Sequence, residues 1–576
     1  MKKTTYKELS ALLAIVALAF ALRVRGLHHQ LPHWTYLDGY VELVQTQHLR
    51  APDSVKWPDM NLGYYPYLTS SVAAVLPRIP ADHGNSGALG AALGSAREPW
   101  VRIRVAAMLL SLGAVVGAWA LARRFVSAPF ALLAATLVAT SLVHITYSSE
   151  QRPHGPASGM VALALWALVA WRERSSARSG IVAALAVTLA IAALQSSFAL
   201  LVPAVVAWWL RERRGSVTSE LGLGLAWLTI LAIGIRLAYP FHFDDRAGAA
   251  GEYDTGAETM WMGGHALYTE RFHARGFGVM LNTFLGFDPW LLALSALGAL
   301  MLGIALVRRR VDRDVEMRFA AWIVLGYAVP FVLVFGVYDM TYDRFVLPLV
   351  PLLALLVAWA AQRAWNALGE TRRGSASGAL LALFVLAPPL AAAWHLGTLR
   401  EREDTFESAA RWLEQNAKPE EDRILLLQNI DLPLAYSRDS LAALNDSQTL
   451  FWTSFQRTLP SELHSSESFH IARPPRKSDE EEADAEYLTP RRLRESGFRY
   501  VVSMPPRRGG VNDAETVESL KALRKGLQKV ATFAPAGEDE RRARAPDFGF
   551  GVTESSTLWN LLSIRAFGPR IEIFEL

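Results

Sequence analysis

The sequence predicts a polytopic α-helical membrane protein, with about 11 transmembrane helices of roughly 20 residues each, that ends in an extracytoplasmic α/β domain. Apolar residues make up 52% of the 576 residues and charged residues 19%, whereas soluble proteins carry about 25% charged residues. Up to about residue 395 the apolar residues form runs long enough to cross a bilayer. From residue 396 the composition is that of a water-soluble domain.

Basic residues between the apolar runs predict the orientation of the membrane part. The candidate spans lie near 8–23, 103–122, 128–147, 156–171, 180–195, 197–210, 220–238, 288–307, 319–337, 345–362 and 376–395. If these spans alternate, the clusters of Lys and Arg all fall on one side, which is the cytoplasmic side of a bacterial inner membrane. We therefore expect a cytoplasmic N-terminus, a membrane domain 1–395, and extracytoplasmic segments 24–102, 239–287 and 396–576.

The segment 396–576 reads as a folded domain. "DTFESAARWLEQNA" places Asp404 three residues before Glu407, the spacing of a helix capping box, and an apolar helical face follows. "RILLLQNI", "FRYVVSM" and "RIEIFEL" are typical of strands. No nucleophile, metal or phosphate motif stands in this segment, so we expect it to assist acceptor handling or stability.

Several function classes find no support in the sequence. The net charge of +4 comes from arginines in short loops on one side of the membrane, so it does not indicate nucleic acid as a partner. The chain has no cysteine, which excludes disulfides and thiolate metal sites. It contains no GxxxxGK, HExxH or GxSxG sequence, which argues against ATP-driven work and zinc hydrolysis.

Asp38 is the first candidate for chemistry. It lies in "HWTYLDGYVEL", among aromatic residues and just beyond the first span. Glu42 follows four residues later, which on a helix places both carboxylates on one face. Aromatic surroundings exclude water and raise the pKa of a carboxyl group, as a general base requires. The alternative is an ordinary interfacial loop, where Trp and Tyr are enriched.

A second cluster of ionisable residues lies in the outer turn "SSEQRPHG", where Glu150, Arg152 and His154 stand within five residues. These side chains are candidates for acid–base chemistry. The alternative is that the charges lie at helix ends, where they are tolerated at low cost.

Arginines near the outer ends of spans are candidates for binding a phosphate, which a guanidinium grips through two parallel hydrogen bonds. The alternative for each is interfacial snorkelling. Aromatic residues of the first outer loop are further substrate-binding candidates. The full set is Arg23, Arg25, Arg102, Arg104, Arg152, Arg236, Arg344, Tyr40, Tyr64 and Tyr65.

A divalent cation is left open. The third outer loop holds metal-capable residue types at a spacing that matches no site we can name, namely His242, Asp244, Asp245, His265 and His273. Another outer turn, "YDMTYDRF", holds Asp339, Asp343 and Arg344. For Arg344 we favour structural pairing with one of these aspartates.

The order of these features resembles the GT-C superfamily of membrane glycosyltransferases. The resemblance rests on "ALRVRGL", "NLGYYPYLTSSVAAVLP", "VRIRVAAMLLSLGAVVGAWALARRF", "FALLAATLVATSLVHITYSSEQRPHG" and "RFVLPLVPLLALLVAWAAQRAW". It covers roughly residues 8–395 and the outward tail. Protein O-mannosyltransferases and the lipid A aminoarabinose transferase are the most similar groups.

The resemblance implies roles for particular residues. The Asp-Glu pair of the family's first outer loop falls on Asp38, followed here by Gly39, so that Glu42 is the substitute for the second acid. An Arg-Pro-Asp sequence of many relatives is here Arg152-Pro153-His154, which leaves Glu150 or His154 in place of the aspartate. The implied donor is a sugar on a polyprenyl phosphate, and the implied acceptor is a hydroxyl group of a glycan, lipid or protein outside the cytoplasm. Transfer with inversion would use Asp38 as base and arginines at the departing phosphate.

Two other functions fit the same sequence. A transporter or flippase of lipid-linked sugars would carry charges buried within its spans and would consist of two related halves. An inactive relative that only binds glycans would keep the fold without the transfer reaction.

Overall fold

The computed structural model describes most of the chain, with gaps in several loops. The described residues are 5–31, 37–50, 66–79, 88–212, 216–239, 259–262, 265–268, 270–307, 315–368, 372–419, 421–427, 430–444, 451–458, 468–473, 489–504, 523–536 and 556–576.

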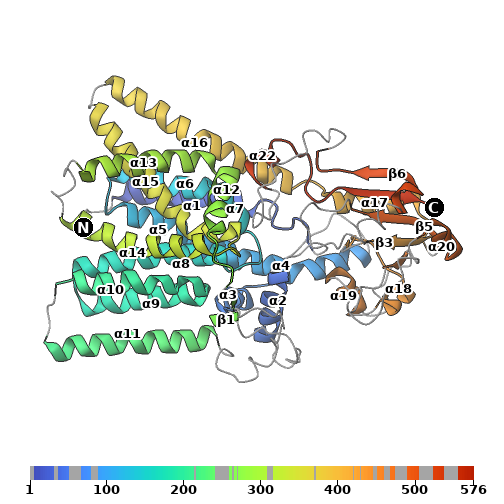
Figure 1. Ribbon diagram of the computed structural model, residues 1–576, viewed down its shortest axis with the longest axis horizontal. Helices are drawn as coiled ribbons and strands as arrows, with labels where there is room; N and C mark the ends of the chain where they lie inside the picture. Colours follow the sequence, from blue (N-terminus) through green and yellow to red (C-terminus); the bar gives the residue numbers. More distant parts are fainter. Residues whose placement is uncertain are drawn as a thin grey trace.

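Long helices form one end of the molecule and a small sheet forms the other (Figure 1). The helical part contains α1 (Tyr6–Val24), α2 (Leu37–Arg50), α3 (Leu68–Val75), α4 (Ala88–Ser111), α5 (Gly113–Ala122), α6 (Ala128–Thr140), α7 (Leu142–Ser148), α8 (His154–Arg174), α9 (Ala177–Ala193), η3 (Gln195–Leu200), α10 (Leu201–Leu210), α11 (Val217–Ala238), the hairpin β1 (Thr259–Met262) and β2 (His265–Tyr268), α12 (Arg275–Phe287), α13 (Pro289–Val307), α14 (Val315–Val337), η5 (Asp343–Leu349), α15 (Val350–Leu368) and α16 (Arg372–Arg400).

Each predicted span falls on helical structure, and the protein is polytopic. Within the described residues, six helices are long and apolar enough to cross a membrane, or up to eight if each of two bent helix pairs is one span. The number of crossings near 11 and the orientation of the termini therefore stay predictions. The predicted boundary between residues 395 and 396 falls inside α16, which continues to Arg400.

Glycines bring α5 and α8 close together. Gly113 and Gly117 on α5, and Gly155 and Gly159 on α8, are each spaced by four residues, so each pair lies on one face of its helix. A Cβ added at Gly117 would lie 2.7 Å from the Cβ of Ala162 on α8, and one at Gly113 would lie 3.4 Å from the Cα of Gly159. Small residues with this spacing allow close helix packing in membranes, where van der Waals contact drives association.

The predicted span 128–147 is broken into α6 and α7, which meet at 56°. Opposite charges hold the two ends at the break. The buried guanidinium of Arg23 donates to the carbonyl oxygens of Val138 (3.3 Å) and Ala139 (2.9 Å) at the end of α6. The buried carboxylate of Asp288 accepts hydrogen bonds at the start of α7. A cation at a helix C-terminus and an anion at an N-terminus both complement the helix dipole.

The C-terminal part is a five-stranded mixed sheet flanked by short helices. Its elements are α17 (Thr405–Asn416), β3 (Arg423–Leu426), α18 (Arg438–Ala443), α19 (Phe451–Thr458), β4 (His470–Ala472), α20 (Pro490–Glu495), β5 (Phe498–Ser503), β6 (Gln528–Phe533), α22 (Leu558–Leu561) and β7 (Ile571–Glu575). The strand order is β4-β3-β5-β7-β6, with β3 parallel to both of its neighbours and β7 antiparallel to both of its own. Strands β3, β5 and β7 lie where the apolar runs predicted them, and the capping box of Asp404 and Glu407 is present.

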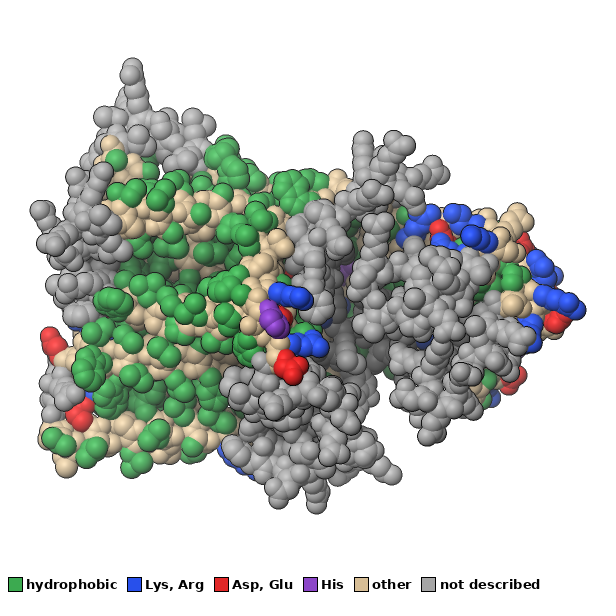
Figure 2. Space-filling view, in the orientation of Figure 1, with side chains coloured by type: hydrophobic (Ala, Val, Ile, Leu, Met, Phe, Trp, Pro, Cys, Tyr) green, Lys and Arg blue, Asp and Glu red, His purple; other side chains and the backbone are tan. Residues whose placement is uncertain are grey.

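Apolar side chains cover much of the visible face of the helical part, whereas basic and acidic side chains gather over the sheet end (Figure 2). One large buried cluster joins the long helices, and a second fills the sheet domain beneath α17. Two residues of the C-terminal segment, Leu561 and Phe567, belong to the first cluster. The chain therefore folds back onto the helical part before it enters β7.

Candidate active site at the outer helix ends

The predicted outer ends of several helices meet at one place. The turn after α1, the middle of α4, the turn between α7 and α8, and the end of α16 pack together there, at the junction between the helices and the sheet domain (Figure 1). Gly26 permits this approach, because its φ of +72° is a left-handed conformation and an added Cβ would lie 2.2 Å from the Cβ of Arg400.

A small cavity of about 20 Å³ opens at this junction, which is room for about one water molecule. Its lining comes from five separate parts of the chain. The lining residues are Gly26, His29, Gln30, Arg104, Ser149, Glu150, Arg400 and Phe567.

The cations around the cavity are held by short contacts. Arg104 Nη1 donates to the carbonyl oxygens of Leu27 (2.7 Å) and His29 (2.8 Å). Arg400 Nη1 donates to Ser149 Oγ (2.6 Å). Arg152 Nε lies 3.4 Å from Glu150 Oε2, and both side chains are buried. Two guanidinium groups and one carboxylate thus line the cavity, and a third guanidinium, that of Arg152, lies beside that carboxylate.

Three predicted residues therefore come together here: Arg104, Glu150 and Arg152. Sequence reasoning missed His29, Ser149, Arg400 and Phe567. Arg400 carried a signal, since it stands at the end of the last apolar run. Phe567 carried none, because only the fold brings the C-terminal segment back to the helices.

Arg23, predicted to bind substrate, lies inside the protein. Its side chain is fully buried, and its guanidinium binds helix-end carbonyls and His144. This arrangement favours a structural role over the predicted contact with a phosphate.

The other predicted arginines lie away from the cavity or pair elsewhere. Arg25 binds Glu401 and stacks on Trp394. Arg102 pairs with Glu98 on the same helix. Arg236 is exposed near the end of α11. Arg344 stacks on the ring of Tyr342, with 4.4 Å to the ring centroid, and on Phe345.

His154 and Asp339 also have defined neighbours. The ring of His154 stacks on Phe345, with 5.3 Å between centroids. Asp339 Oδ2 lies 2.7 Å from His273 Nδ1, and its Oδ1 accepts from the backbone N–H groups of His273 and Arg275. Partial burial acts to raise the pKa of Asp339, but the hydrogen bonds from His273 and Arg275 outweigh it and the pKa is lowered.

The two acids of the first outer loop, Asp38 and Glu42, both lie on α2, four residues apart. The backbone of Asp38 lies in the first turn of this helix. Glu42 is fully buried where α2 packs against α3. Polar neighbours are held close by, because Ser70 Oγ donates to Gln45 Oε1 (2.7 Å) and Thr46 Oγ1 donates to the Glu42 carbonyl (2.7 Å).

Several predicted side chains lie outside the described residues. They are those of Asp38, Tyr40, Tyr64, Tyr65, His242, Asp244, Asp245 and His265. Among the side chains that are described, no group of three or more His, Cys, Asp or Glu is arranged to hold a metal ion.

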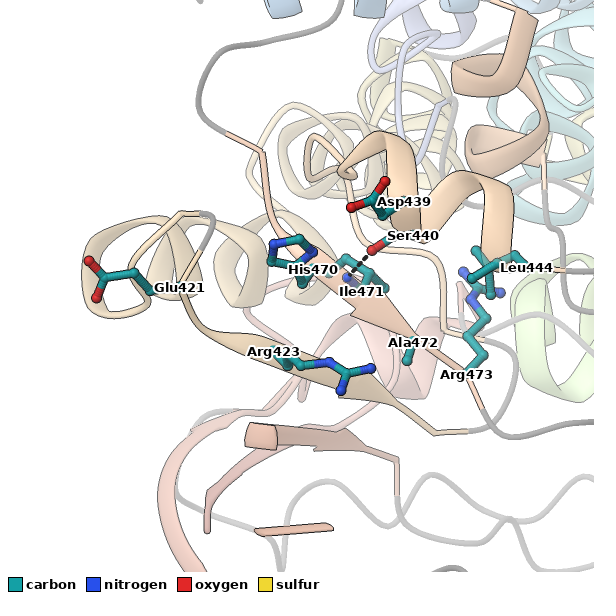
Figure 3. Close-up of a pocket in the computed structure, with 10 residues that line it drawn as sticks. Glu421, Arg423, Asp439, Ser440, Leu444, His470, Ile471, Ala472 and Arg473 are labelled. Atoms are coloured by element: carbon teal, nitrogen blue, oxygen red, sulfur yellow. Dashed lines mark hydrogen bonds between the residues drawn. The ribbon is translucent and has the colours of Figure 1, made fainter. Parts of the chain in front are cut away.

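A second pocket, of about 500 Å³, lies in the C-terminal domain beside the edge strand β4. Figure 3 shows Ser440 on α18 pointing to the backbone of Ile471 on β4, with Arg423 on the adjacent strand. The wall is fixed by hydrogen bonds: Ile471 N–H donates to Ser440 Oγ (2.8 Å), Ser437 Oγ lies 3.1 Å from His470 Nδ1, and Arg473 pairs with buried Asp431 (3.0 Å). The pocket presents both donors and acceptors.

The fold and the outer cavity describe a polytopic helical protein with a cationic site at its helix ends. Residues 88–240 match the sequence family described as dolichyl-phosphate-mannose-protein mannosyltransferase. This match confirms the resemblance to GT-C membrane glycosyltransferases, and with it glycosyltransferase as the class of enzyme. No curated protein sequence matches the chain significantly.

Solved structures of similar overall arrangement include three glycosyltransferases. The apo oligosaccharyltransferase of Archaeoglobus fulgidus is 12% identical with a TM-score of 0.48, over 99% of this chain and 89% of that one. ArnT from Cupriavidus metallidurans bound to undecaprenyl phosphate is 14% identical with a TM-score of 0.43, over 90% and 95%. The arabinofuranosyltransferase AftD from Mycobacteria is 16% identical with a TM-score of 0.43, over 100% and 40%.

Proposed function

We propose that the protein transfers a sugar from a polyprenyl-phosphate donor to an acceptor hydroxyl on the outer side of a bacterial cytoplasmic membrane. One observation carries the proposal: the segment that matches the mannosyltransferase family contains Arg104, Glu150 and Arg152, which meet at the outer cavity. The family description itself names a sugar on a lipid phosphate as donor. The C-terminal domain would then lie outside the cytoplasm, and the N-terminus inside.

The cationic cluster suits the departing lipid phosphate. Guanidinium groups bind phosphate oxygens through charge-assisted hydrogen bonds and stabilise negative charge as the glycosidic bond breaks. Arg104 and Arg400 line the cavity itself, and Arg152 lies beside Glu150. The cavity has room for only about one water, so a lipid phosphate would bind at its mouth or displace Phe567.

The reaction would be a single displacement with inversion. The acceptor oxygen forms a bond to the anomeric carbon, the bond from that carbon to the phosphate oxygen breaks, and the lipid phosphate leaves with the electron pair. Asp38 takes the proton of the acceptor hydroxyl. This assignment follows the resemblance, which places the acidic motif of the first outer loop at Asp38, on α2 one turn before buried Glu42. The steps require no metal, although a divalent cation at the phosphate stays an alternative.

The acceptor would be held in part by the C-terminal domain. Its pocket of about 500 Å³ lies within the usual range for ligand sites. Carboxylate, guanidinium, imidazole and hydroxyl groups all line it, and a polyhydroxylated acceptor can bond to each of them. A glycan is therefore the acceptor class that this pocket favours over a lipid.

Replacing Asp38 with Asn tests the assignment of the base. We expect transfer of sugar from a polyprenyl-phosphate donor in membranes to fall by about 10²–10⁴-fold. Glu495→Gln is the matched control, because Glu495 is an exposed carboxylate of α20 paired with Arg491. Undiminished transfer by the Asp38→Asn protein would remove Asp38 as base.

A transporter of lipid-linked sugars has one observation in its favour, the broken helix α6–α7 with charged Arg23 and Asp288 buried beside it. Transporters use such breaks to bind ions and substrates. Here, however, both charges bind helix ends, which favours the enzyme. Sugar movement across liposomes without transfer to an acceptor would reverse this preference.

A further inference from the structure

The segment Ser556–Gly568 joins the sheet domain to the helices, and we call it the strap. Its middle packs on the helical part: Trp559 Nε1 donates to the carbonyl of Leu285 at the end of α12 (3.1 Å), and His395 Nε2 on α16 donates to the carbonyl of Leu561 (2.9 Å). Ser556 Oγ lies 3.2 Å from Thr146 Oγ1 on α7. The strap is thus fixed to three helices.

The strap also binds the sheet domain at its far end. Arg565 N–H donates to the carbonyl of Pro535 (2.6 Å), and Thr405 N–H donates to the carbonyl of Phe567 (2.9 Å). Its two faces differ. Leu561 is buried in the cluster of the long helices, whereas Trp559 is 48% exposed and Leu562 is 70% exposed.

The exposed face of the strap continues a stripe on α12. Phe277, Leu281 and Leu285 are spaced by four residues, so they lie on one side of that helix, and all three are exposed. The opposite side of α12 is buried against the protein. Amphipathic helices of this kind lie in the plane of a membrane interface with the apolar side toward the acyl chains.

The surroundings of this stripe indicate which partner covers it. Helix α12 meets α13 at 118°, and α13 carries exposed Leu297 and Leu300 along its length. Helix α16, which contacts α22, exposes Trp394. The stripe therefore continues the apolar surface of two helices that belong to the membrane part, and Trp394 and Trp559 on this surface are of the residue type enriched at membrane interfaces.

We propose that the α12 stripe and the strap together bind the outer-leaflet interface of the bilayer, with Trp559 and Leu562 inserted among the lipids. The partner is the lipid interface itself and not a second protein, because the apolar surface is continuous with that of α13 and α16. The strap then anchors the soluble domain to the membrane surface.

The contact between the strap and the membrane also affects the cavity. Phe567 lies five residues after Leu562, and its ring contacts that of His29 with 4.7 Å between centroids. Both residues line the cavity at Arg104. Lipid that holds the strap in place therefore also holds one wall of the cavity.

Because the chain has no cysteine, labels at single introduced cysteines can test the proposed membrane contact directly. Leu562→Cys and Leu281→Cys would each carry a nitroxide spin label in the full-length protein reconstituted in phosphatidylcholine–phosphatidylglycerol nanodiscs. Oxygen, which concentrates in the bilayer, and a water-soluble nickel complex would report the accessibility of each label. Leu297→Cys is the membrane reference, and Arg491→Cys, on a side chain that is 88% exposed, is the water reference.

We expect both test labels to show a several-fold loss of nickel accessibility against the Arg491→Cys label, with oxygen accessibility approaching that of Leu297→Cys. Two test sites guard against a local effect of one label. Nickel accessibility at Leu562→Cys equal to that of Arg491→Cys would contradict membrane contact of the strap. Equal values for Leu281→Cys would overturn the α12 stripe. A label with low accessibility to oxygen as well as to nickel would indicate contact with protein in place of lipid and would overturn the proposal.

Discussion

The guanidinium of Arg23 donates a hydrogen bond to Nδ1 of His144 over 2.9 Å, with both side chains fully buried. Since a guanidinium only donates, Nδ1 must be unprotonated and His144 neutral. The proton then lies on Nε2, which donates to Ser158 Oγ (2.8 Å), and Ser158 donates to the carbonyl of Gly155 (2.7 Å). This chain of hydrogen bonds connects α1, α7 and the start of α8, and it fixes the turn that carries Glu150.

Replacement of Arg23 by Met should destabilise the protein strongly. It removes the donor from the carbonyls of Val138 and Ala139 and from His144, and each buried acceptor left without a partner costs about 1–3 kcal/mol. Thermal unfolding in detergent should show a clearly lower midpoint. Arg25→Met is the control, since its partner Glu401 is half exposed and such pairs contribute about 0–1 kcal/mol. Equal midpoints for both variants would contradict the role of Arg23.

Asp288 is expected to matter through the position of α7. Its carboxylate accepts from the N–H groups of Leu142 (2.8 Å) and Val143 (3.1 Å) and from Ser141 Oγ (2.7 Å). Asp288→Ala should cost about 2 kcal/mol or more, the upper range for loss of a helix cap. Because α7 leads to Glu150, transfer activity should fall as well. Asp439→Ala, at the first turn of α18, is the control in unfolding measurements. A variant that unfolds like the wild type would show that the cap is dispensable.

The cavity arginines should control binding of the lipid phosphate. Arg104→Ala and Arg400→Ala each remove a cation, and a charge-assisted hydrogen bond is worth about 1.5–3 kcal/mol. The Kd for undecaprenyl phosphate should therefore rise by about 10- to 100-fold. Arg411→Ala is the matched control, because Arg411 is exposed on α17 and pairs with Glu403. Unchanged affinity in both cavity variants would place the phosphate elsewhere.

The sequence predicted the helical elements well because their signal is local. A run of apolar residues must be helical in a membrane, so each predicted range falls on helix, and the Asp404–Glu407 capping box is present. Partners distant in the chain were not predictable. Arg23 was expected at a phosphate, yet it binds the end of α6 more than a hundred residues later, and the break that requires it carries no Pro or Gly. Phe567 reaches the cavity only through the strap.

The site itself was predicted in part for the same reason. Glu150 and Arg152 lie within one turn, so their proximity follows from the sequence, whereas Arg104 and Arg400 meet them only through helix packing. The assignment of Asp38 as base stays a prediction, since its side chain lies outside the described residues.

The contribution of Asp339 to stability should depend on pH. Its pKa is lowered in the folded protein, because hydrogen bonds from His273 and Arg275 outweigh the effect of burial. A carboxyl group with a depressed pKa stabilises the fold above its unfolded pKa of about 3.9, and this stabilisation is lost as pH falls through the folded value.

The neighbouring charged groups Glu270, Arg271 and Arg275 are exposed. The difference in unfolding midpoint between wild type and Asp339→Asn should therefore shrink as pH falls below about pH 4. His273→Asn should reduce the same difference at neutral pH, because it removes one of the three donors to Asp339. A difference that grows below about pH 4 would show that Asp339 is held protonated, contrary to the geometry.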